Sequence, residues 1–538
     1  MTALPVPAAG ARTGRHAATA ALLLGLVLAA FAEALAGTLL ALGRADVIGD
    51  TAATPDEFAW LDVAYTAAKI AGFAVAPWLL TRFRPTQAVV LATVTLGVAS
   101  ALAALSTRLE LLILLRAIQG VAGGAVLVGG QALLFLAFPR PGQPVLQAVF
   151  AAGAVVVPAT LAPALQGWII DSQSWIWVLA AALVTSLAAA GLILFGDPET
   201  PPPAEALPFD VVGFGLLGTA AAAAAFALGQ GSRWNWFESG RIGFSVLVAV
   251  VAFVAFLLQQ RRAGPNALLQ GAVFGTEPFP FAFMVSLVAG AALFGSALLI
   301  PAFAVNILGF TPLAAGQLLL PGAAFFCGGL LIAAVLIQRF DCPVLANVPV
   351  GIGLVMAAFF MLSGSTLESS AADLNPALFL RGLGLGFLFL ALTMIAFARL
   401  PTRQLAYGIA IFNIGRQFGG LFGVAGLQTL IDRQAAANQA VLGANLSPGL
   451  ASATERLSAT TAALMQKGMD LPAAGATARS LLGRAIAQQS TVIAFDTAFF
   501  VLALLFVFAA PLLIGLKIAF ARAAGRRAAR ASTLETTP

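Results

Sequence analysis

Fourteen long apolar runs, separated by short polar intervals, constrain the fold of this chain more than any other feature. About 20 apolar residues are enough for an α-helix to cross a bilayer, and a helix satisfies its own backbone hydrogen bonds there. The runs lie at 18–42, 59–80, 87–106, 110–136, 145–170, 175–195, 211–230, 240–259, 279–305, 312–337, 343–364, 376–398, 404–431 and 490–518. The sequence therefore predicts an all-α membrane protein with fourteen transmembrane helices.

The composition excludes several other classes of protein. Hydrophobic residues make up 60% of the chain and charged residues 9%, whereas soluble domains are about 25% charged. The net charge of +6 does not indicate nucleic-acid binding, because the basic residues are scattered at the ends of the apolar runs. Cys327 and Cys342 lack metal or redox spacing, and His16 is the only histidine. We therefore expect no metal site, no cofactor and no nucleic-acid partner.

The loop charges predict how the chain is oriented, because cytoplasmic loops carry an excess of Lys and Arg. An even number of spans places both termini on one side. That side receives Arg12, Arg15, Arg82, Arg84, Arg140, Arg261, Arg262, Arg339, Arg399, Arg403 and the basic tail beyond residue 516. The first run is too long for a signal-peptide core and has no clear cleavage site. We expect a multi-pass protein of the cytoplasmic (inner) membrane with both termini in the cytoplasm.

Two arginines lie in very apolar surroundings within their runs, Arg116 in 110–136 and Arg381 in 376–398. An arginine near the middle of a membrane helix costs about 3 to more than about 10 kcal/mol unless it faces a polar cavity or a partner. Arg116, its neighbour Gln119 and Arg381 are therefore candidates for proton coupling or substrate binding. The structural alternatives are hydrogen bonding to backbone carbonyls for Arg116 and close helix packing for Arg381.

Glu33 and Lys69 lie at comparable depths in the first two runs. Burial and a nearby cation act in opposite directions on the protonation of a carboxyl group, so a carboxyl balanced between them can load and release a proton. We expect a Glu33–Lys69 pair. It could be a proton switch, a site for an anionic group or a neutralising structural pair.

The two halves of the chain repeat one another. Arg82 and Arg339 close the second and tenth runs, 257 residues apart, and Arg116 and Arg381 follow two runs later, 265 residues apart. This nearly constant offset indicates a duplicated bundle of six helices. We place the first bundle at 1–200, an inserted helix pair at 201–265 and the second bundle at 266–538, with an extracytoplasmic loop at about 432–489.

Several motifs resemble the major facilitator superfamily, and in particular its 14-span drug:proton antiporter branch. The segment 116–120 (RAIQG) is similar to the fourth-helix motif of the family, whose arginine is implicated in proton handling. The segments 209–231, 308–316, 412–420 and 495–499 resemble other parts of that branch. The resemblance covers nearly the whole chain and implies two six-helix bundles plus two inserted helices.

The chain also departs from the family pattern. Pro77, Thr81 and Arg84 replace the glycine, aspartate and second glycine of the loop motif, and Glu33 stands at about the depth of a first-helix aspartate. The fifth-helix antiporter motif is reduced to Gly153 and three further residues, and its prolines should kink that helix. Glycines at spacing four, such as Gly120 with Gly124 and Gly382 with Gly386, should permit close helix approach. The candidates for gating or packing are Arg82, Gly120, Pro158, Pro163, Gly167, Arg339 and Arg416, with Arg416 expected to be structural.

These features predict a secondary transporter that exports small amphipathic molecules or drugs in exchange for protons. No Walker motif is visible, so we do not expect ATP to drive transport. Export of a specific metabolite or organic acid is the alternative, favoured by Lys69, while a lipid-modifying membrane enzyme or a non-transporting sensor is remote. The expected partners are a small-molecule substrate, protons and the lipid bilayer. In a two-membrane bacterium the 432–489 loop could also meet a periplasmic adaptor protein.

Overall fold

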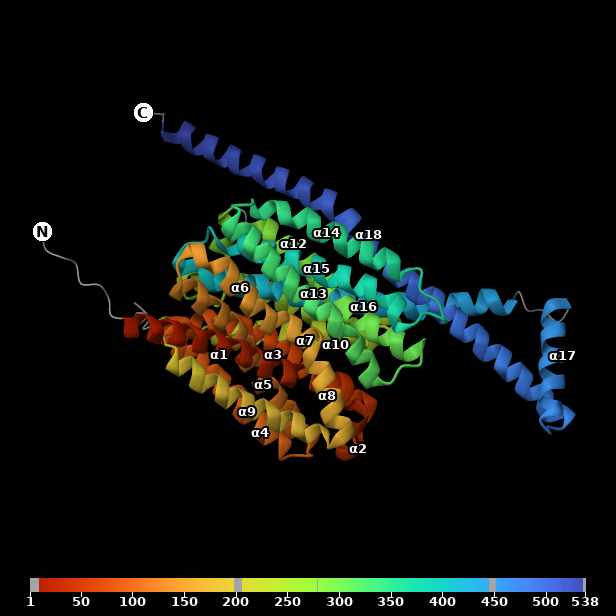
Figure 1. Cartoon of the computed structure of the whole chain (residues 1–538). Coiled ribbons are helices and arrows are strands. Elements are labelled where there is room, and N and C mark those ends of the chain that lie inside the picture. Colours follow the sequence, from red (N-terminus) through yellow and green to blue (C-terminus); the bar gives the residue numbers. More distant parts are fainter. Residues whose placement is uncertain (1–8, 198–205, 278, 445–450, 536–538) are drawn as a thin grey trace, which may run out of the picture.

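The computed structural model describes residues 9–197, 206–277, 279–444 and 451–535, and these ranges form helices without any β-strand (Figure 1). The first half contains α1 (Ala9–Leu42), α2 (Arg44–Thr51), α3 (Pro55–Arg82), α4 (Pro85–Ala104), α5 (Leu109–Ala137), α6 (Gln143–Ala151), α7 (Val157–Ala159), α8 (Leu161–Ser172) and α9 (Trp175–Phe195). The second half contains α12 (Phe279–Asn306), α13 (Pro312–Arg339), α14 (Asn347–Leu362), α15 (Ala371–Phe397), α16 (Thr402–Ala444), α17 (Ala451–Gln466) and α18 (Leu471–Glu535). The expected all-α architecture is confirmed.

Thirteen of the described helical stretches are long and apolar enough to cross a membrane, and they coincide with thirteen of the expected runs. The remaining run, 404–431, lies within α16, which is continuous over 43 residues. Asn413, Arg416 and Gln417 lower its apolar character. Helix α16 packs against α3, α12 and α18 inside the bundle. We therefore assign it as a further membrane span, which brings the total to the fourteen that the sequence predicts.

The two halves use matching helix contacts. Helix α3 packs on α5 and α4 on α9 in the first half, while α13 packs on α15 and α14 on α18 in the second. Both α3 and α13 are 28 residues long, start with a proline after a capping threonine and end with an arginine. The hydroxyls of Thr54 and Thr311 each accept a hydrogen bond from a backbone N–H in the first turn, which fixes where these helices begin.

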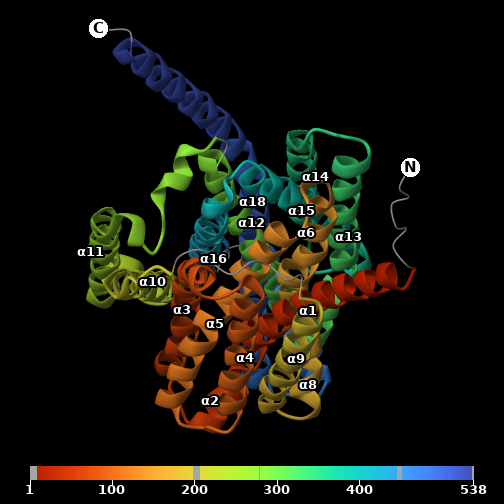
Figure 2. The ribbon, with the colours of Figure 1, turned by 90° about the vertical axis from the view of Figure 1, so that its left-hand side faces the viewer.

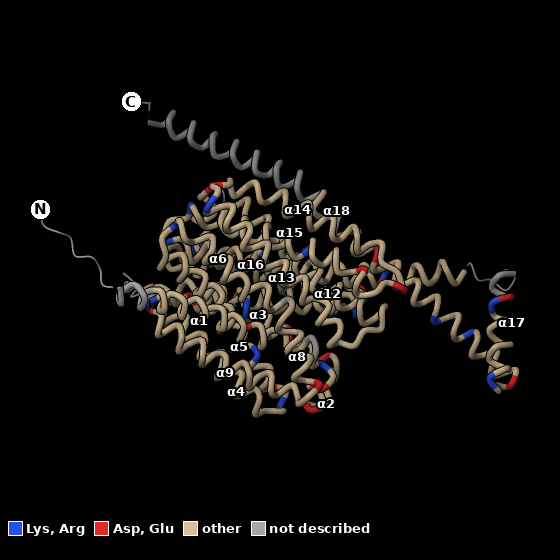
Figure 3. Tube along the Cα trace, in the orientation of Figure 1, with Lys and Arg blue, Asp and Glu red and all other residues tan. Residues whose placement is uncertain are grey.

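The charged residues lie mostly at the two ends of the bundle and on a helical arm that projects beyond one end (Figure 3). The arm consists of the end of α16, α17 and the start of α18, and it covers the described part of the predicted 432–489 loop. The start of α1 and the end of α18 lie at the opposite end (Figure 1). We call the end that carries the arm the distal end.

The fifth span is interrupted rather than only kinked. A wider helical turn at 152–156 follows α6, and the chain breaks at Thr160, where φ is −145° and ψ is −67°, before α8 begins. Pro158 cannot donate a backbone hydrogen bond to the preceding turn, whereas Pro163 lies in the first turn of α8, where a missing N–H is tolerated. The kink predicted from Pro158 is therefore confirmed, whereas Pro163 does not cause it, and the break divides the span into separate segments.

Glycines bring α3 and α5 into backbone contact. A Cβ on Gly124 would collide with the carbonyl oxygen of Lys69 and lie 2.8 Å from the backbone nitrogen of Phe73, and Gly120 meets α3 in the same way. Gly382 approaches the backbone of α13 equally closely in the second half. The close approach predicted from the glycine spacing is therefore confirmed for both helix pairs.

The Gly124→Ala variant should test this close contact. Its methyl group would force α3 and α5 apart, and overpacking of this kind costs about 1–3 kcal/mol. We expect a lower thermal unfolding temperature for the purified protein. Gly191→Ala is the matched control, because a Cβ on that glycine of α9 meets no atom within 4 Å. Equal stability of both variants would contradict the close packing of α3 and α5.

The inserted helices α10 (Val211–Gln230) and α11 (Gly240–Ala263) lie beside the two halves rather than within them (Figure 2). Helix α10 packs against α3 of the first half and α16 of the second, whereas α11 packs mainly on α10. The ring of Phe226 on α10 stacks on Trp60 of α3 at 5.0 Å between centroids. The pair therefore contacts both halves through α10.

Topology reporters can test the orientation predicted from the loop charges. We expect reporters fused after Pro203 and after Ala263 to report the cytoplasm, and one after Asn235 to report the extracytoplasmic side, because the inserted pair crosses the membrane twice. Alkaline phosphatase and green fluorescent protein fusions provide the measurement. A cytoplasmic signal at Asn235 would remove the inserted pair from the topology.

Candidate transport site

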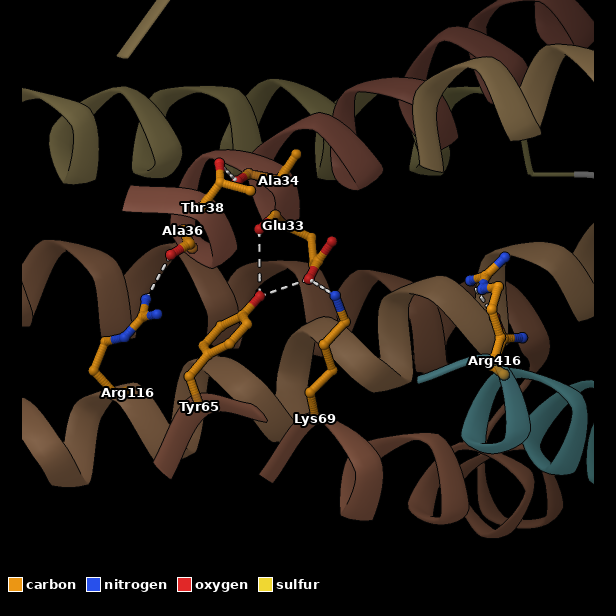
Figure 4. A network of polar contacts seen from close by, with 9 residues as sticks. Glu33, Ala34, Ala36, Thr38, Tyr65, Lys69, Arg116 and Arg416 are labelled. Carbon is orange, nitrogen blue, oxygen red and sulfur yellow. Dashed lines mark hydrogen bonds and ion pairs between the residues drawn. The ribbon is translucent and has the colours of Figure 1, made fainter. Parts of the chain in front are cut away.

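A buried carboxylate in α1 is the centre of the site. Glu33 is 1% exposed, and its Oε1 lies 2.5 Å from Nζ of Lys69 on α3. The hydroxyl of Tyr65, one turn earlier on α3, donates to the same oxygen at 2.6 Å (Figure 4). The predicted Glu33–Lys69 contact is therefore present, and Tyr65 joins it.

Two glycines provide the space for this cluster. A Cβ on Gly123 of α5 would lie 2.8 Å from Cγ of Glu33, and a Cβ on Gly37 of α1 would lie 2.7 Å from the Tyr65 hydroxyl oxygen. Neither side chain could keep its position if these glycines were larger. The close helix packing thus determines where the carboxylate lies.

Arg116 of α5 borders the cluster and is 3% exposed. Its Nη1 donates to the Ala36 carbonyl oxygen of α1 at 2.5 Å and to Oε1 of Gln119 at 3.0 Å. The guanidinium also lies 4.2 Å from the ring centroid of Tyr65, in a cation–π contact. Its Nε and Nη2 are buried without a hydrogen-bond acceptor among the described residues. The side chain is therefore only partly satisfied by the backbone carbonyl.

Two glutamines connect the cluster to its neighbouring helices. Gln119 donates to the hydroxyl of Ser100 on α4 at 3.3 Å. Gln166, on the segment after the break in the fifth span, donates to the Leu35 carbonyl oxygen at 2.8 Å. Gln166 was not among the predicted site residues, because its only signal in the sequence is an amide within an apolar run.

Asp62 is a second acid near the cluster, and it was not among the predicted site residues. It lies on the same face of α3 as Lys69, seven residues earlier, and it interacts electrostatically with Arg116 and Tyr65. Its side chain is exposed, and it forms no ion pair within the described part of the chain. The signal was available, because Asp62 stands inside the apolar run 59–80.

Arg416 of the second half lies to one side of the cluster, apart from Glu33 and Lys69 (Figure 4). It lies on α16, interacts electrostatically with Glu33 and donates to Oδ1 of Asn413 at 2.6 Å. Its guanidinium also lies 5.2 Å from the ring centroid of Phe389. We expected Arg416 to be structural, and that expectation did not include its electrostatic interaction with Glu33 of the other half.

Arg381 is placed differently from Arg116. It lies on α15, is 5% exposed and donates from Nε to the Ser296 hydroxyl on α12 at 3.0 Å. It forms no ion pair among the described residues. The two arginines are not brought together, although each contacts the first helix of its own half.

The predicted gating or packing residues lie away from the Glu33 cluster, except Gly120 and Arg416. Arg82 and Arg339 are exposed at the ends of α3 and α13. Gly167 is buried within α8. Arg82 and Arg339 therefore fit roles at helix ends, and Gly167 fits a role in helix packing.

Known proteins show the same architecture and related sequences. A solved structure of the proton:xylose symporter XylE aligns with a TM-score of 0.54 at 12% identity, covering 92% of this chain and 95% of that one, which establishes likeness of fold alone. Multidrug export protein EmrB of Haemophilus influenzae is 26% identical over 409 residues, 75% of this chain and 79% of the relative. Fatty acid resistance protein FarB of Neisseria gonorrhoeae is 24% identical over 505 residues, 93% of this chain and 96% of the relative.

The family model described as Major Facilitator Superfamily matches residues 22–424. The match includes the Glu33 cluster, both inserted helices and most of the second half. It confirms the resemblance drawn from the motifs. The chain is a multi-pass membrane protein that belongs to the major facilitator superfamily.

Proposed function

We propose that this protein exports small amphipathic molecules, including drugs, from the cytoplasm in exchange for protons. One observation carries the proposal, namely the buried Glu33 carboxylate, which contacts Lys69 and accepts a hydrogen bond from Tyr65 on the neighbouring helix. The names of relatives support the substrate class. Besides EmrB, the Tetracenomycin C resistance and export protein of Streptomyces glaucescens is 26% identical over 431 residues.

Protonation of Glu33 would change the interactions around it. The ionised carboxylate accepts the Tyr65 hydroxyl and neutralises Lys69 through one oxygen. A neutral carboxyl group interacts more weakly with the Tyr65 hydroxyl and with the Lys69 ammonium, and it no longer attracts the positive charge of Arg416. The electrostatic interaction between the two halves therefore decreases. A proton can in this way bias the relative position of the two halves.

Exchange also places a condition on the substrate. A site that bound substrate and proton at the same time would carry both in the same direction. Exchange therefore requires that binding of the proton weakens binding of the substrate, and the reverse. A proton entering the cell gains about 2.3 kcal/mol per 100 mV of membrane potential, which can drive export against a modest gradient. The coupling therefore needs a group, Glu33 in this proposal, whose protonation lowers substrate affinity.

Export of an organic acid is a second candidate. The cluster contains three cations, Lys69, Arg116 and Arg416, for two acids, Glu33 and Asp62. This excess of positive charge favours an anionic group, and the relative FarB is named for fatty acid resistance. No observation favours a lipid-modifying enzyme or a non-transporting sensor.

We further propose that the protein lies in the cytoplasmic membrane with both termini in the cytoplasm. The distal end would then face outward, and the arm formed by α16, α17 and α18 would be the surface available to a periplasmic adaptor. The boundaries 1–200, 201–265 and 266–538 remain our division of the chain into two bundles and an inserted pair.

The Glu33→Gln variant tests the proposed proton site. Glutamine keeps the size of the side chain but cannot cycle between charged and neutral forms. We expect proton-driven export from proteoliposomes to fall to background, while substrate binding and passive exchange persist. Glu110→Gln is the matched control, because Glu110 is an exposed acid in the first turn of α5.

Lys69→Ala completes this test, because it removes the cation that stabilises the Glu33 carboxylate. We expect the pH dependence of transport to differ from that of the parent protein, because Glu33 loses its charged partner. The Glu33→Gln, Lys69→Ala double variant should fold but remain uncoupled. Full activity of Glu33→Gln would place the proton site elsewhere, and an unchanged pH profile of Lys69→Ala would show that the two residues do not interact in transport.

Arg116→Lys tests the arginine of the fourth span. Lysine keeps the charge but cannot donate to Ala36 and Gln119 from a planar fork while contacting the Tyr65 ring. Losing one charge-assisted hydrogen bond, worth about 1.5–3 kcal/mol, corresponds to about a tenfold or greater fall in transport rate. Expression and thermal stability measured in parallel separate this effect from misfolding. Normal transport by Arg116→Ala would rule out a functional role.

A further inference from the structure

The loop between α10 and α11 makes polar contacts with both halves at the distal end. We call residues 231–239 the connecting loop. Nη1 of Arg233 lies 2.9 Å from Oδ1 of Asp56, at the start of α3 in the first half. The hydroxyl of Ser232 donates to Oδ2 of Asp432 at 2.6 Å, on α16 of the second half. The loop therefore bridges two helices that belong to different bundles.

A tryptophan strengthens the contact with the second half. The indole N–H of Trp236 donates to the Thr429 hydroxyl at 3.0 Å. Trp236 and the preceding Asn235 adopt φ values of 54° and 50°, which is unusual for a bulky residue. A Cβ on Gly231 would lie 2.8 Å from the Trp236 ring, so this glycine makes room for the turn. The loop is thus shaped to hold Trp236 against α16.

The remaining contacts of the inserted pair are mainly apolar. Leu217 and Ala221 of α10 form one cluster with Ala67 of α3 and with Phe418 and Leu421 of α16. Lipid chains can replace apolar contacts in a membrane, so these give little preference for one position over another. The three polar contacts of the connecting loop fix its position relative to both halves.

We propose that the inserted helix pair functions as a latch that stabilises the state in which the two halves are closed at the distal end. This inference rests on the proposed function, since export requires the halves to separate alternately at either end. When Asp56 and Asp432 move apart, the loop cannot keep its contacts with both. Weakening the latch therefore shifts the population toward the state open at the distal end.

Distances between spin labels at the distal end test the latch. Leu105 follows α4 in the first half and is 84% exposed, and Leu367 precedes α15 in the second half and is 39% exposed. Labels at Leu105→Cys and Leu367→Cys, with Cys327 and Cys342 replaced by alanine, report the separation in lipid nanodiscs. The Arg233→Ala, Trp236→Phe double variant should raise the ratio of long to short distances by about threefold to tenfold.

A matched control lies in the same region. The guanidinium of Arg241 lies over the Trp234 ring, 5.0 Å from its centroid, so Arg241→Ala removes one positive charge but none of the three polar contacts that join the connecting loop to the two halves. It should leave the distance distribution unchanged. The exchange Arg233→Asp with Asp56→Arg restores the ion pair in reverse and should return the distribution to that of the parent protein.

An unchanged distance distribution in the double variant overturns the latch, as does an equal shift in Arg241→Ala or failure of the charge exchange to restore the parent distribution. The measurement needs no substrate and no proton gradient. A protein without proton-driven export could therefore still show the latch, and a protein without the latch could still lose export on Glu33→Gln. The two proposals fail separately.

Discussion

The buried ion pair between Glu33 and Lys69 is the interaction on which the arrangement of the first half depends. Charged groups are costly inside a membrane protein unless they are paired and hydrogen-bonded. Here the lysine and the Tyr65 hydroxyl share one carboxylate oxygen, while Gly37 and Gly123 leave room for the contact. The close approach of α3 and α5 brings the arginine of the fourth span to the same place.

The two halves of the duplicated fold differ in the charged residues around their corresponding arginines. Arg116 and Arg381 occupy corresponding spans and each bonds to the first helix of its half, yet only Arg116 has acids within electrostatic reach. Arg416 of the second half interacts electrostatically with Glu33 of the first. This asymmetry fits a division of labour in which one half carries the proton and the other responds to it.

The inserted pair gives the fold a further connection between its halves. Polar contacts are individually modest at an exposed surface, commonly about 0–1 kcal/mol for an ion pair. Conformational equilibria in transporters are decided by differences of this size, because the alternative states are separated by only a few kcal/mol. A short loop that contacts both bundles can therefore influence the equilibrium without contributing to the site itself.

The sequence alone determined the helical membrane fold, because runs of about 20 apolar residues leave little alternative in a bilayer. It also predicted the duplication, the Glu33–Lys69 pair and a kink in the fifth span, since each depends on local pattern or depth. Asp62 was visible as an acid within an apolar run, but only the tertiary structure showed its neighbours and those of Gln166 and Arg416, because these depend on which helix faces which. The bridging contacts of the connecting loop were equally hidden, since each joins residues more than 150 positions apart in the sequence. Helix periodicity places a side chain on a face, but packing decides what that face meets.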